Sequence, residues 1–342
     1  MGPPRRPLVS VLLPVYDAGA TLAETLASLA AQTLEDYEMV AVDDGSTDGS
    51  LQLLQDRAVR DPRVRPLPGA HAGLVPALNR GLSACRGDYV ARMDADDLAH
   101  PERLARQVAL LQADPGLSVA SCLVETFPAA SVGAGFRIYE AWLNRLVTHA
   151  DICREIYIES PIPHPTAVVR RLELGELGGY RDVGWPEDYD LWLRYHQAGR
   201  RFAKVPEVLL RWREHPGRLT HTDSRYSVEN FLRAKAHFLA AGPLRGRQVI
   251  VWGAGKTGRR LSKHLVRAGR PPTAFVDIAA HRLGRSLRGA PIIGPAALPA
   301  LWRAAERPFL VAAVSSRGAR ELIRQALREM GLVEVDDYLC AA

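Results

Sequence analysis

The chain has 342 residues, of which 47% are hydrophobic and 24% are charged. This length suits two domains better than a single core, and the composition is that of a globular protein rather than of a disordered chain. The apolar runs, such as residues 8–15 and 309–314, are strand-sized and far shorter than the roughly 20 residues of a membrane helix. We therefore expect a cytoplasmic protein with no signal peptide before its first strand, which at most contacts the inner face of a membrane peripherally.

The net charge of +6 is unevenly distributed along the chain. Residues 247–342 contain 16 Lys and Arg against 7 Asp and Glu, so the rest of the chain is slightly acidic. A basic segment can attract nucleotides, anionic lipid or nucleic acid. No basic helix interleaved with aromatic residues occurs, however, and we expect no nucleic-acid partner. The four cysteines form no CxxC pair and predict reduced thiols rather than a zinc site or disulfides; they are Cys85, Cys122, Cys153 and Cys340.

The first third of the chain alternates strand and helix patterns. Residues 8–15 form a near-continuous apolar run, as expected of a strand that is covered on both faces. The TLAE segment at residues 21–24 has the pattern of a capping box, in which Thr21 begins a helix. Further elements are predicted at residues 38–42 (strand), 51–54 (helix, capped by Asp48), near 64 (strand), 75–83 (helix), 88–93 (strand) and from 101 (helix). This alternation predicts a parallel α/β sheet.

The rest of the chain divides into two further blocks. After residue 117 we predict strands at 119–126 and 166–170, a helical stretch at 139–160, and helices at 187–197 and 227–239. A second α/β unit then has strands at 248–252, 273–277 and 309–314 and a helix at 319–330. The sequence therefore predicts a first domain at 1–240, a linker at 241–246 and a second domain at 247–342.

Acidic residues cluster at three points, where predicted strands or loops end. They are Asp43 and Asp44; Asp94, Asp96 and Asp97; and Glu187 and Asp188. Ligands of open α/β sheets bind beyond the carboxyl ends of the strands. Carboxylates gathered at one edge repel each other unless a cation neutralises them. A divalent cation, Mn²⁺ or Mg²⁺, together with a bound diphosphate would account for the arrangement.

Four segments give these clusters a more specific meaning: VSVLLPVY (9–16), VDDGSTD (42–48), MDADD (93–97) and WPEDYD (185–190). In order and spacing they resemble the motifs of family 2 glycosyltransferases, over about residues 7–240. The resemblance implies the GT-A nucleotide-diphospho-sugar transferase fold. It also implies inverting transfer of a sugar from a nucleotide-diphosphate sugar, by default a UDP-sugar, to a hydroxyl of a glycan, glycolipid or protein acceptor. The implied setting is synthesis of bacterial surface glycans or glycoconjugates.

The resemblance assigns donor-side roles to individual residues. Pro14, Tyr16, Asp44 and Asp94 would line the nucleotide-sugar, with Asp44 accepting from the base and Tyr16 packing on its ring. The sequence Asp94-Ala-Asp96 matches the DxD motif, with Asp96 as the direct metal ligand. An alternative remains for Asp44, which could simply cap the following helix. Asp97 is left outside the metal set, as a supporting group or a cap.

The resemblance also assigns the acceptor side. Asp188 matches the catalytic base, which takes the proton of the acceptor hydroxyl while that oxygen attacks the anomeric carbon opposite the leaving diphosphate. Trp185 and Glu187 would lie near the acceptor or support the base, and Glu187 could instead orient the helix. Two histidines complete the set. His164 contacts donor phosphate or acceptor, or is structural, and His215 is a second metal ligand or closes over the diphosphate.

Position 17 departs from the family pattern, because it is Asp17 where Asn is usual. This exchange weakens the expectation that the loop after residue 16 binds the nucleotide.

The turn GAGKTG at residues 253–258 follows a predicted strand and opens a predicted helix, and Asp277 ends the next strand. This is the context of a dinucleotide-binding fingerprint, with Gly253, Gly255 and Gly258 as its three glycines. The unit resembles the small Rossmann-like domains appended to some bacterial sugar-modifying enzymes, which implies NAD or another nucleotide as ligand. Glycines that serve only close packing of strand and helix are the alternative.

Two other functions fit parts of the pattern. A nucleotidyltransferase also holds metal with carboxylates, but it should carry a Gly-rich, basic phosphate loop where residues 13–17 read LPVYD. A non-catalytic or regulatory sugar-nucleotide-binding protein would bind donor without turnover, which the intact Asp188 disfavours. The motifs do not distinguish among donor sugars, acceptors, linkages or oligomeric states.

Overall fold

The structure is a computed structural model that describes residues 6–342. The expectation that no signal peptide precedes the first strand concerns in part residues 1–5, which lie outside this range. Contacts within the chain divide it into two compact units. The first contains residues up to 152, 161–183 and 194–222, and the second contains residues 153–160, 184–193 and 223–342.

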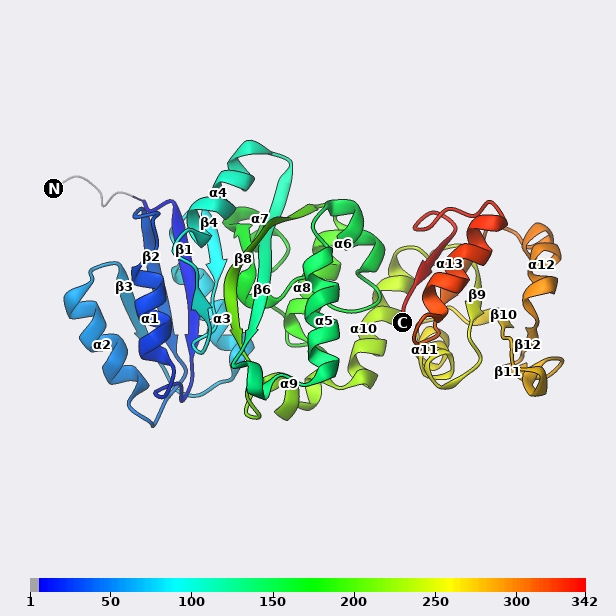
Figure 1. Cartoon of the computed structure of the whole chain (residues 1–342), viewed down its shortest axis with the longest axis horizontal. Helices are drawn as coiled ribbons and strands as arrows, with labels where there is room; N and C mark the ends of the chain where they lie inside the picture. Colours follow the sequence, from blue (N-terminus) through cyan, green and yellow to red (C-terminus); the bar gives the residue numbers. More distant parts are fainter. Residues whose placement is uncertain (1–5) are drawn as a thin grey trace. The chain divides into compact units, whose positions relative to one another are not determined.

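The first unit is built on a sheet that has, within residues 6–342, eight strands in the order β3-β2-β1-β4-β7-β6-β8-β5. The strands are β1 (Val9–Val15), β2 (Tyr37–Asp43), β3 (Val64–Pro68), β4 (Tyr89–Arg92), β5 (Leu98–Ala99), β6 (Leu117–Phe127), β7 (Val168–Arg170) and β8 (Arg201–Arg213). Strands β1 to β4 are parallel, as the sequence predicts, and Figure 1 shows β1, β2 and β3 side by side. Because β7 is antiparallel to β4 and β6, and β5 is antiparallel to β8, the complete sheet is mixed.

Helices cover this sheet and bury its apolar side chains. They are α1 (Leu22–Ala30), α2 (Ser50–Arg60), α3 (Leu74–Ala84), α4 (Arg103–Ala113), α5 (Ala134–Arg145), α6 (His149–Glu155) and α7 (Arg171–Glu176), with α9 (Leu219–Thr222) and the 3-10 turns η1 (Ala129–Ser131) and η2 (His164–Thr166). Leu13 of β1 belongs to the core cluster that includes residues of α1, α2 and α4. On α3, a Cβ at Gly81 would lie 2.3 Å from the side chain of Leu12 and 2.6 Å from that of Val42, so this helix packs closely on β1 and β2.

One local prediction for this unit was wrong, and one strand was not predicted. Thr21 does not form a capping box, because its hydroxyl donates to the backbone oxygen of Ala95 at 3.0 Å and caps no backbone N–H of α1. Strand β8 was not predicted, because its sequence RFAKVPEVLLRWR mixes charged residues and a proline with its apolar residues. The segment that follows β8 contributes to the candidate site.

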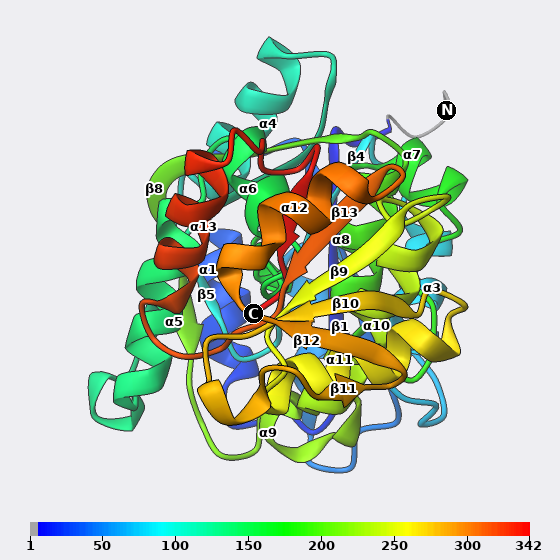
Figure 2. The same ribbon diagram turned by 90° about the vertical axis from the view of Figure 1, so that its right-hand side faces the viewer.

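The second unit contains a second sheet, whose order within the described residues is β11-β12-β10-β9-β13-β14. Its strands are β9 (Gln248–Trp252), β10 (Pro272–Val276), β11 (Ser286–Leu287), β12 (Ala290–Ile293), β13 (Pro308–Ala312) and β14 (Tyr338–Cys340). All neighbours are parallel except the short β11, and Figure 2 shows β12, β10 and β9 fanned side by side. Numbered along the chain, the parallel strands have the order 3-2-1-4-5, which is the order of a nucleotide-binding doubly wound sheet.

Helices of this unit include α10 (Val228–Ala241), α11 (Lys256–Arg267), α12 (Leu298–Ala304), α13 (Ala319–Glu329), the start of α8 (Glu187–Gln197) and the 3-10 turns η3 (Ser224–Tyr226), η4 (Ala280–Arg282) and η5 (Pro295–Ala297). Helix α10 packs on α11, where Glu229 meets His264 at 2.8 Å and Lys263 at 3.2 Å. Buried Lys235 donates to the backbone oxygen of Ala341 at 3.1 Å. The domain boundary predicted at 241–246 stays a prediction. Helix α10, which precedes this range, belongs to the same compact unit as the second sheet, which follows the range.

Within residues 6–342, no helix combines the length and apolar character that crossing a membrane requires.

Candidate active site

Three of the predicted site residues follow the carboxyl ends of neighbouring strands. Tyr16 follows β1, Asp44 follows β2, and Asp94 lies two residues after β4. Strand β1 pairs in parallel with β2 on one side and β4 on the other, so all three strands end at the same edge of the sheet. Pro14 lies within β1, opposite Val42 of β2. The sheet itself therefore brings the predicted donor-side residues to one edge.

Asp44 is 4% exposed and holds the loop that precedes α3. Its carboxylate accepts the backbone N–H groups of Ala72 at 3.0 Å and Gly73 at 2.8 Å, and Nδ1 of His71 lies 2.9 Å from its Oδ2. The alternative that Asp44 caps the following helix is therefore wrong. Asp48 takes that role, as predicted, since it accepts the N–H of the first residue of α2 at 3.0 Å.

The rings of Tyr16 and His71 stack beside this carboxylate, with centroids 4.1 Å apart and planes at 26°. Both side chains are about half exposed. Stacked rings next to a buried carboxylate can contact a base by its face and by its edge at once. His71 was not predicted, because it lies in an irregular loop, where an isolated histidine in the run PLPGAHAG at residues 66–73 was the only signal.

Asp17, the departure from the family pattern, has a clear structural role. Its φ is +45°, in the left-handed region that Asn and Asp adopt more readily than most residues. Its carboxylate accepts the backbone N–H of Thr47 at 2.7 Å, and its own N–H donates to Ser46 at 3.1 Å. Aspartate therefore satisfies the backbone requirement that asparagine would satisfy here.

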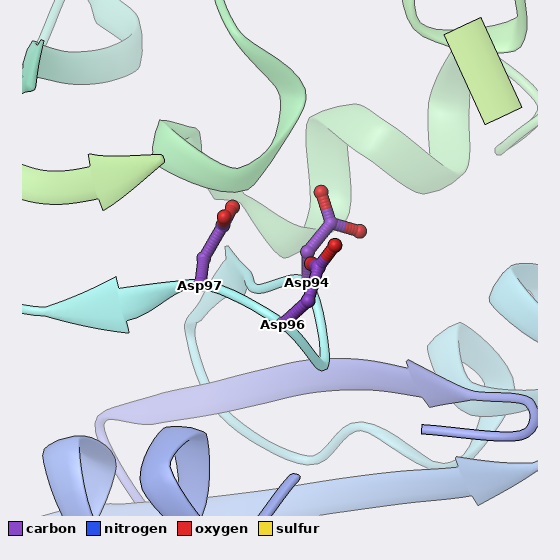
Figure 3. Close-up of side chains that lie close together, drawn as sticks. All are labelled: Asp94, Asp96 and Asp97. Atoms are coloured by element: carbon purple, nitrogen blue, oxygen red, sulfur yellow. The ribbon is translucent and has the colours of Figure 1, made fainter. Parts of the chain in front are cut away.

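The loop after β4 carries the acidic cluster. One carboxylate oxygen each from Asp94, Asp96 and Asp97 lies within 4.8 Å of the others, and Figure 3 shows the three side chains projecting from this loop. The guanidinium of Arg92, which is buried, contacts the Asp94 carboxylate. Oδ2 of Asp97 is buried and has no hydrogen-bond partner in the described part of the chain. Asp97, which the sequence analysis left outside the metal set, is therefore close enough to join it.

Burial and mutual repulsion perturb two of these carboxyls. Burial and the charge of Asp94 raise the pKa of Asp96, while His215 and Arg218 oppose the increase. Burial raises the pKa of Asp97 well above its ordinary value, and the charges of Asp96 and Asp94 add to the effect. Added positive charge would stabilise the ionised form of such a cluster.

The end of β8 is bonded to the acidic loop. The backbone N–H of Arg213 donates to Oδ1 of Asp97 at 2.8 Å, and its Nε donates to the backbone oxygen of Asp96 at 2.6 Å. Two residues later, Nε2 of His215 lies 2.9 Å from Oδ2 of Asp96. The two residues that the sequence analysis assigned to the metal therefore meet. Carboxylate oxygens with one imidazole nitrogen are donors that suit Mn²⁺.

His164 lies in η2, which packs against β4. Its ring is buried and stands 5.3 Å from the ring of Tyr180, at 51°. Thr166 of the same turn shares a 2.6 Å hydrogen bond with Ser121. This packing is compatible with a structural histidine and with a donor contact, so both interpretations stay open.

In the second unit, the start of α8 places Glu187 in a buried polar site. The hydroxyl of Tyr226 donates to both Glu187 carboxylate oxygens, at 3.0 and 3.1 Å, and a guanidinium nitrogen of Arg225 lies 3.7 Å away. Burial and the charges of Glu187 and Asp188 raise the pKa of Tyr226 well above its ordinary value, so the phenol remains a donor. Neither Tyr226 nor Arg225 was predicted, because the short segment that contains them, before α10, carries no recognisable motif.

Trp185 and Asp190 hold each other, because the indole N–H donates to Oδ1 of Asp190 at 3.1 Å. Oδ1 of Asp188 accepts the N–H of Tyr189 at 2.7 Å. Asp188 and the acidic loop fall in different compact units. The shared cleft that the sequence predicts between Asp188 and Asp96 therefore stays a prediction.

The glycine-rich turn also lies in the second unit, between β9 and α11. Gly253 has φ +121°, and a Cβ on Gly258 would lie 1.7 Å from the backbone oxygen of Gly253. Gly255 is the N-cap residue of α11. The carboxylate of Asp277 lies beside the turn and accepts the N–H of Ala254 at 2.8 Å.

A model of the family "Glycosyl transferase family 2" matches residues 10–171. The putative glycosyltransferase EpsE of Bacillus subtilis is 33% identical over 232 residues, which are 66% of this chain and 79% of that protein. The amylovoran biosynthesis glycosyltransferase AmsE of Erwinia amylovora is 32% identical over 210 residues, which are 60% of this chain and 76% of that protein. The chain belongs to glycosyl transferase family 2.

The fold of this family member is also found among solved structures. The crystal structure of S. aureus TarS 1-349 in complex with UDP-GlcNAc has a TM-score of 0.55 and 20% identity, and covers 76% of this chain and 72% of that one. The predicted GT-A-type glycosyltransferase fold is confirmed, followed by a second α/β sheet.

Family membership confirms the predicted glycosyltransferase function, which fits better than the nucleotidyltransferase or non-catalytic alternatives. The matched residues 10–171 include Tyr16, Asp44 and the acidic loop, whereas Asp188 and His215 lie beyond them. The roles of individual residues in this family member remain predictions.

Proposed function

We propose that the chain transfers a sugar from a nucleotide-diphosphate sugar to an acceptor hydroxyl, with a divalent cation and with inversion at the anomeric carbon. The observation that carries this proposal is the 2.9 Å approach of His215 to Asp96, at the sheet edge that also carries the Tyr16–His71 ring pair. Family membership supplies the class of reaction. The chemistry of this edge matches a nucleotide joined to a diphosphate.

The stacked rings and Asp44 would bind the nucleoside. A base can pack on Tyr16 or His71, and a base N–H can donate to the carboxylate of Asp44. That carboxylate is already oriented by two backbone N–H groups of the loop before α3. Pro14 and Asp94 would complete the donor side near the ribose. Orientation before binding reduces the entropy that donor binding costs.

Asp96 and His215 would hold Mn²⁺ or Mg²⁺, with Asp94 and Asp97 close by. When bound, the cation supplies positive charge that stabilises the leaving diphosphate. The chain's own contribution is to fix these donors: Arg213 ties the end of β8 to the backbone of the acidic loop, so the imidazole and carboxylate stay together. The unpaired, buried Oδ2 of Asp97 fits a site that receives a cation.

Asp188 would accept the proton of the acceptor hydroxyl as the new glycosidic bond forms. Attack on the face opposite the diphosphate inverts the anomeric configuration and needs no covalent intermediate. Glu187, held by Tyr226 and Arg225, would position the base, and Trp185 would line the acceptor side. His164 would contact donor phosphate or acceptor.

Synthesis of a surface polysaccharide or glycoconjugate, in the cytoplasm or at the inner face of the membrane, is the proposed setting. The similarity to AmsE, an amylovoran biosynthesis glycosyltransferase, supports a polysaccharide product. The complex of TarS with UDP-GlcNAc makes that molecule the first donor to test. The acceptor would be a glycan, glycolipid or protein hydroxyl.

The test compares wild type, Asp188→Asn and a control, Asp182→Asn, in which an exposed carboxylate six residues earlier is neutralised. UDP-, GDP- and dTDP-sugars are supplied with Mn²⁺ or Mg²⁺, and transfer is followed by mass spectrometry. We expect Asp188→Asn to lower kcat by about 10²- to 10⁴-fold with donor binding unchanged, and Asp182→Asn to behave as wild type. Transfer by Asp188→Asn at the wild-type rate would show that another group is the base. NMR of the product anomer tests inversion.

A further inference from the structure

The second unit contains a cavity of about 460 Å³, and none of its lining residues is assigned to glycosyl transfer. Trp252, Asp277 and Ala313, at or just beyond the ends of β9, β10 and β13, line it. The chain passes from β9 to β10 on one side, whereas β13 pairs with the other side of β9. The cavity therefore lies where the strand order reverses, which is where doubly wound sheets bind ligands. Its volume is within the roughly 300–1,000 Å³ of small-molecule sites.

The three glycines of the adjoining turn have different structural reasons. Gly253 needs its left-handed backbone, and its Cβ would lie 2.8 Å from the backbone oxygen of Ala313. A Cβ on Gly258 would collide with the backbone of Gly253. Gly255, in contrast, has φ −80°, which any residue adopts, and a Cβ there would meet only the guanidinium end of Arg282, at 3.4 Å. Close packing on the backbone explains Gly253 and Gly258 but not Gly255, which borders the cavity.

Positive groups and hydroxyls lie around Gly255. Helix α11 begins at Lys256, and among residues 6–342 no side chain caps its N-terminal N–H groups. Lys256 is exposed, lines the cavity and makes no ion pair within the described residues. Thr257, the next residue, shares a 2.8 Å hydrogen bond with Ser315, and the two hydroxyls also line the cavity. Together, uncapped N–H groups, an ammonium and hydroxyls can bind a phosphate group at the mouth of the turn.

Asp277, which stands where a dinucleotide site has its ribose-binding carboxylate, is already bonded to other groups of the protein. In such sites the carboxylate after the second strand binds the ribose hydroxyls. Here Asp277 accepts the N–H groups of Ala254 at 2.8 Å and Ala279 at 2.9 Å, and it is paired with Arg282 at 2.9 Å. Binding NAD through this carboxylate would require the Arg282 pair to open. The guanidinium instead adds positive charge beside Gly255.

The extent of the fold also favours a ligand smaller than a dinucleotide. Dinucleotides span two mononucleotide-binding halves, but the β13 side has one helix, α13, before β14, and the path from β10 to β12 contains η4 and β11 without an α-helix. Two apolar side chains line the cavity and are largely exposed: Ile278 at 81% and Leu322 at 70%. Exposed apolar walls next to a phosphate-binding turn suit a base followed by phosphates.

We propose that this cavity binds a nucleoside diphosphate, free or as its sugar ester. The diphosphate lies against the backbone at Gly255 and the ammonium of Lys256, and the base lies between Ile278 and Leu322. None of the residues of this proposed site is a proposed metal ligand or the proposed catalytic base. It relies on the proposed function only for the choice of uridine as the first nucleoside to test. A donor sugar-nucleotide and the released diphosphate share the chemistry that the cavity recognises.

The experiment measures binding of UDP, UDP-GlcNAc, GDP and NAD to the full chain by calorimetry, with EDTA present so that metal-dependent donor binding is absent. We expect one UDP or UDP-GlcNAc per chain, and the stronger of the two identifies the source of the ligand. Lys256→Ala, which removes the ammonium, and Gly255→Val, which adds bulk to the cavity wall beside Arg282, should each weaken binding about tenfold or more. The controls are Arg260→Ala, another exposed cation of α11, and Gly294→Val, where a Cβ meets only Leu283 at 3.7 Å.

Three results would overturn the proposal: no nucleoside diphosphate bound in EDTA; binding unchanged by Lys256→Ala and Gly255→Val; or NAD bound in preference, with that binding lost in Gly255→Val. The first two would leave the turn with a packing role alone. Failure here is distinguishable from failure of the proposed function. The Asp188→Asn test reads transfer with metal, whereas this one reads binding without it.

Discussion

The acidic loop after β4 and the glycine-rich turn after β9 occupy equivalent places, each at the carboxyl end of a parallel strand. The first presents the carboxylates of Asp94, Asp96 and Asp97. The second presents uncapped N–H groups and the ammonium of Lys256. Carboxylates repel phosphate unless a cation lies between them, whereas a helix N-terminus attracts phosphate directly. The same sheet edge can thus serve a diphosphate in two opposite ways, and the side chains beyond the strand decide which.

The two compact units do not correspond to one unit for catalysis and one for ligand binding. The Glu187–Asp188 pair belongs by its contacts to the second unit, with Tyr226 and α10. Asp188, the proposed catalytic base, therefore belongs by its contacts to the second unit.

The largest expected effect tests whether sugar transfer needs a metal ion while nucleotide binding in the second unit does not. Adding EDTA, or replacing Asp96 with Asn, should lower sugar transfer on the order of 10³-fold, because the charge that stabilises the leaving diphosphate is lost. UDP binding to the second unit should persist under both conditions. Steady-state transfer assays and calorimetry on the same samples measure the two effects.

Asp114→Asn, at a half-exposed carboxylate paired with Arg201, is the control for Asp96→Asn and should leave transfer unchanged. Full transfer in EDTA would show that the acidic loop, like the glycine-rich turn, works without a metal ion.

The second prediction concerns the structural glycines. Gly258→Ala should destabilise the chain by about 3 kcal/mol, since its Cβ would lie 1.7 Å from a backbone oxygen that cannot move aside. Gly255→Ala should cost less than about 1 kcal/mol, the usual effect of alanine at an N-cap position. Urea unfolding of the full chain measures both. Equal losses would show that Gly255 also serves packing, and would weaken the nucleotide site.

The third prediction tests the buried support of the base. Tyr226→Phe removes the hydroxyl that donates to both oxygens of Glu187 and should lower kcat about tenfold with KM unchanged, because a buried carboxylate loses its partner and shifts. The pH profile of kcat should move as well, which a purely structural defect would not cause. Tyr338→Phe, in β14, is the matched control. A change in KM alone would place Tyr226 on the acceptor side instead.

The smallest expected effect concerns the nucleoside platform. His71→Ala should raise KM for the donor about fivefold with kcat unchanged, because the loss of one stacked ring costs about 1 kcal/mol. His100→Ala, an exposed histidine elsewhere in the first unit, should have no effect. An unchanged KM for His71→Ala would mean that Tyr16 and Asp44 suffice for the base.

The sequence by itself determined the family and the class of fold, and it predicted where the two proposed sites lie. Strand patterns followed by Asp44, Asp94 and Gly253 were recognisable because strand periodicity and turn residues are local signals. Their chemistry also follows from residue type, whatever the tertiary packing. The departures came where local signals conflict, as in β8, whose charged residues and proline hid a thirteen-residue strand.

Only the tertiary structure decided which residues meet. His215 reaches Asp96 across 119 positions of sequence because β8 is placed between β6 and β5, and no local pattern encodes that order. His71 joins Tyr16 and Asp44 because β3, β2 and β1 are neighbours, and Tyr226 reaches Glu187 because η3 leads into α10 beside the start of α8. Strand order and helix docking minimise the free energy of the whole core, so these contacts depend on residues far from the site.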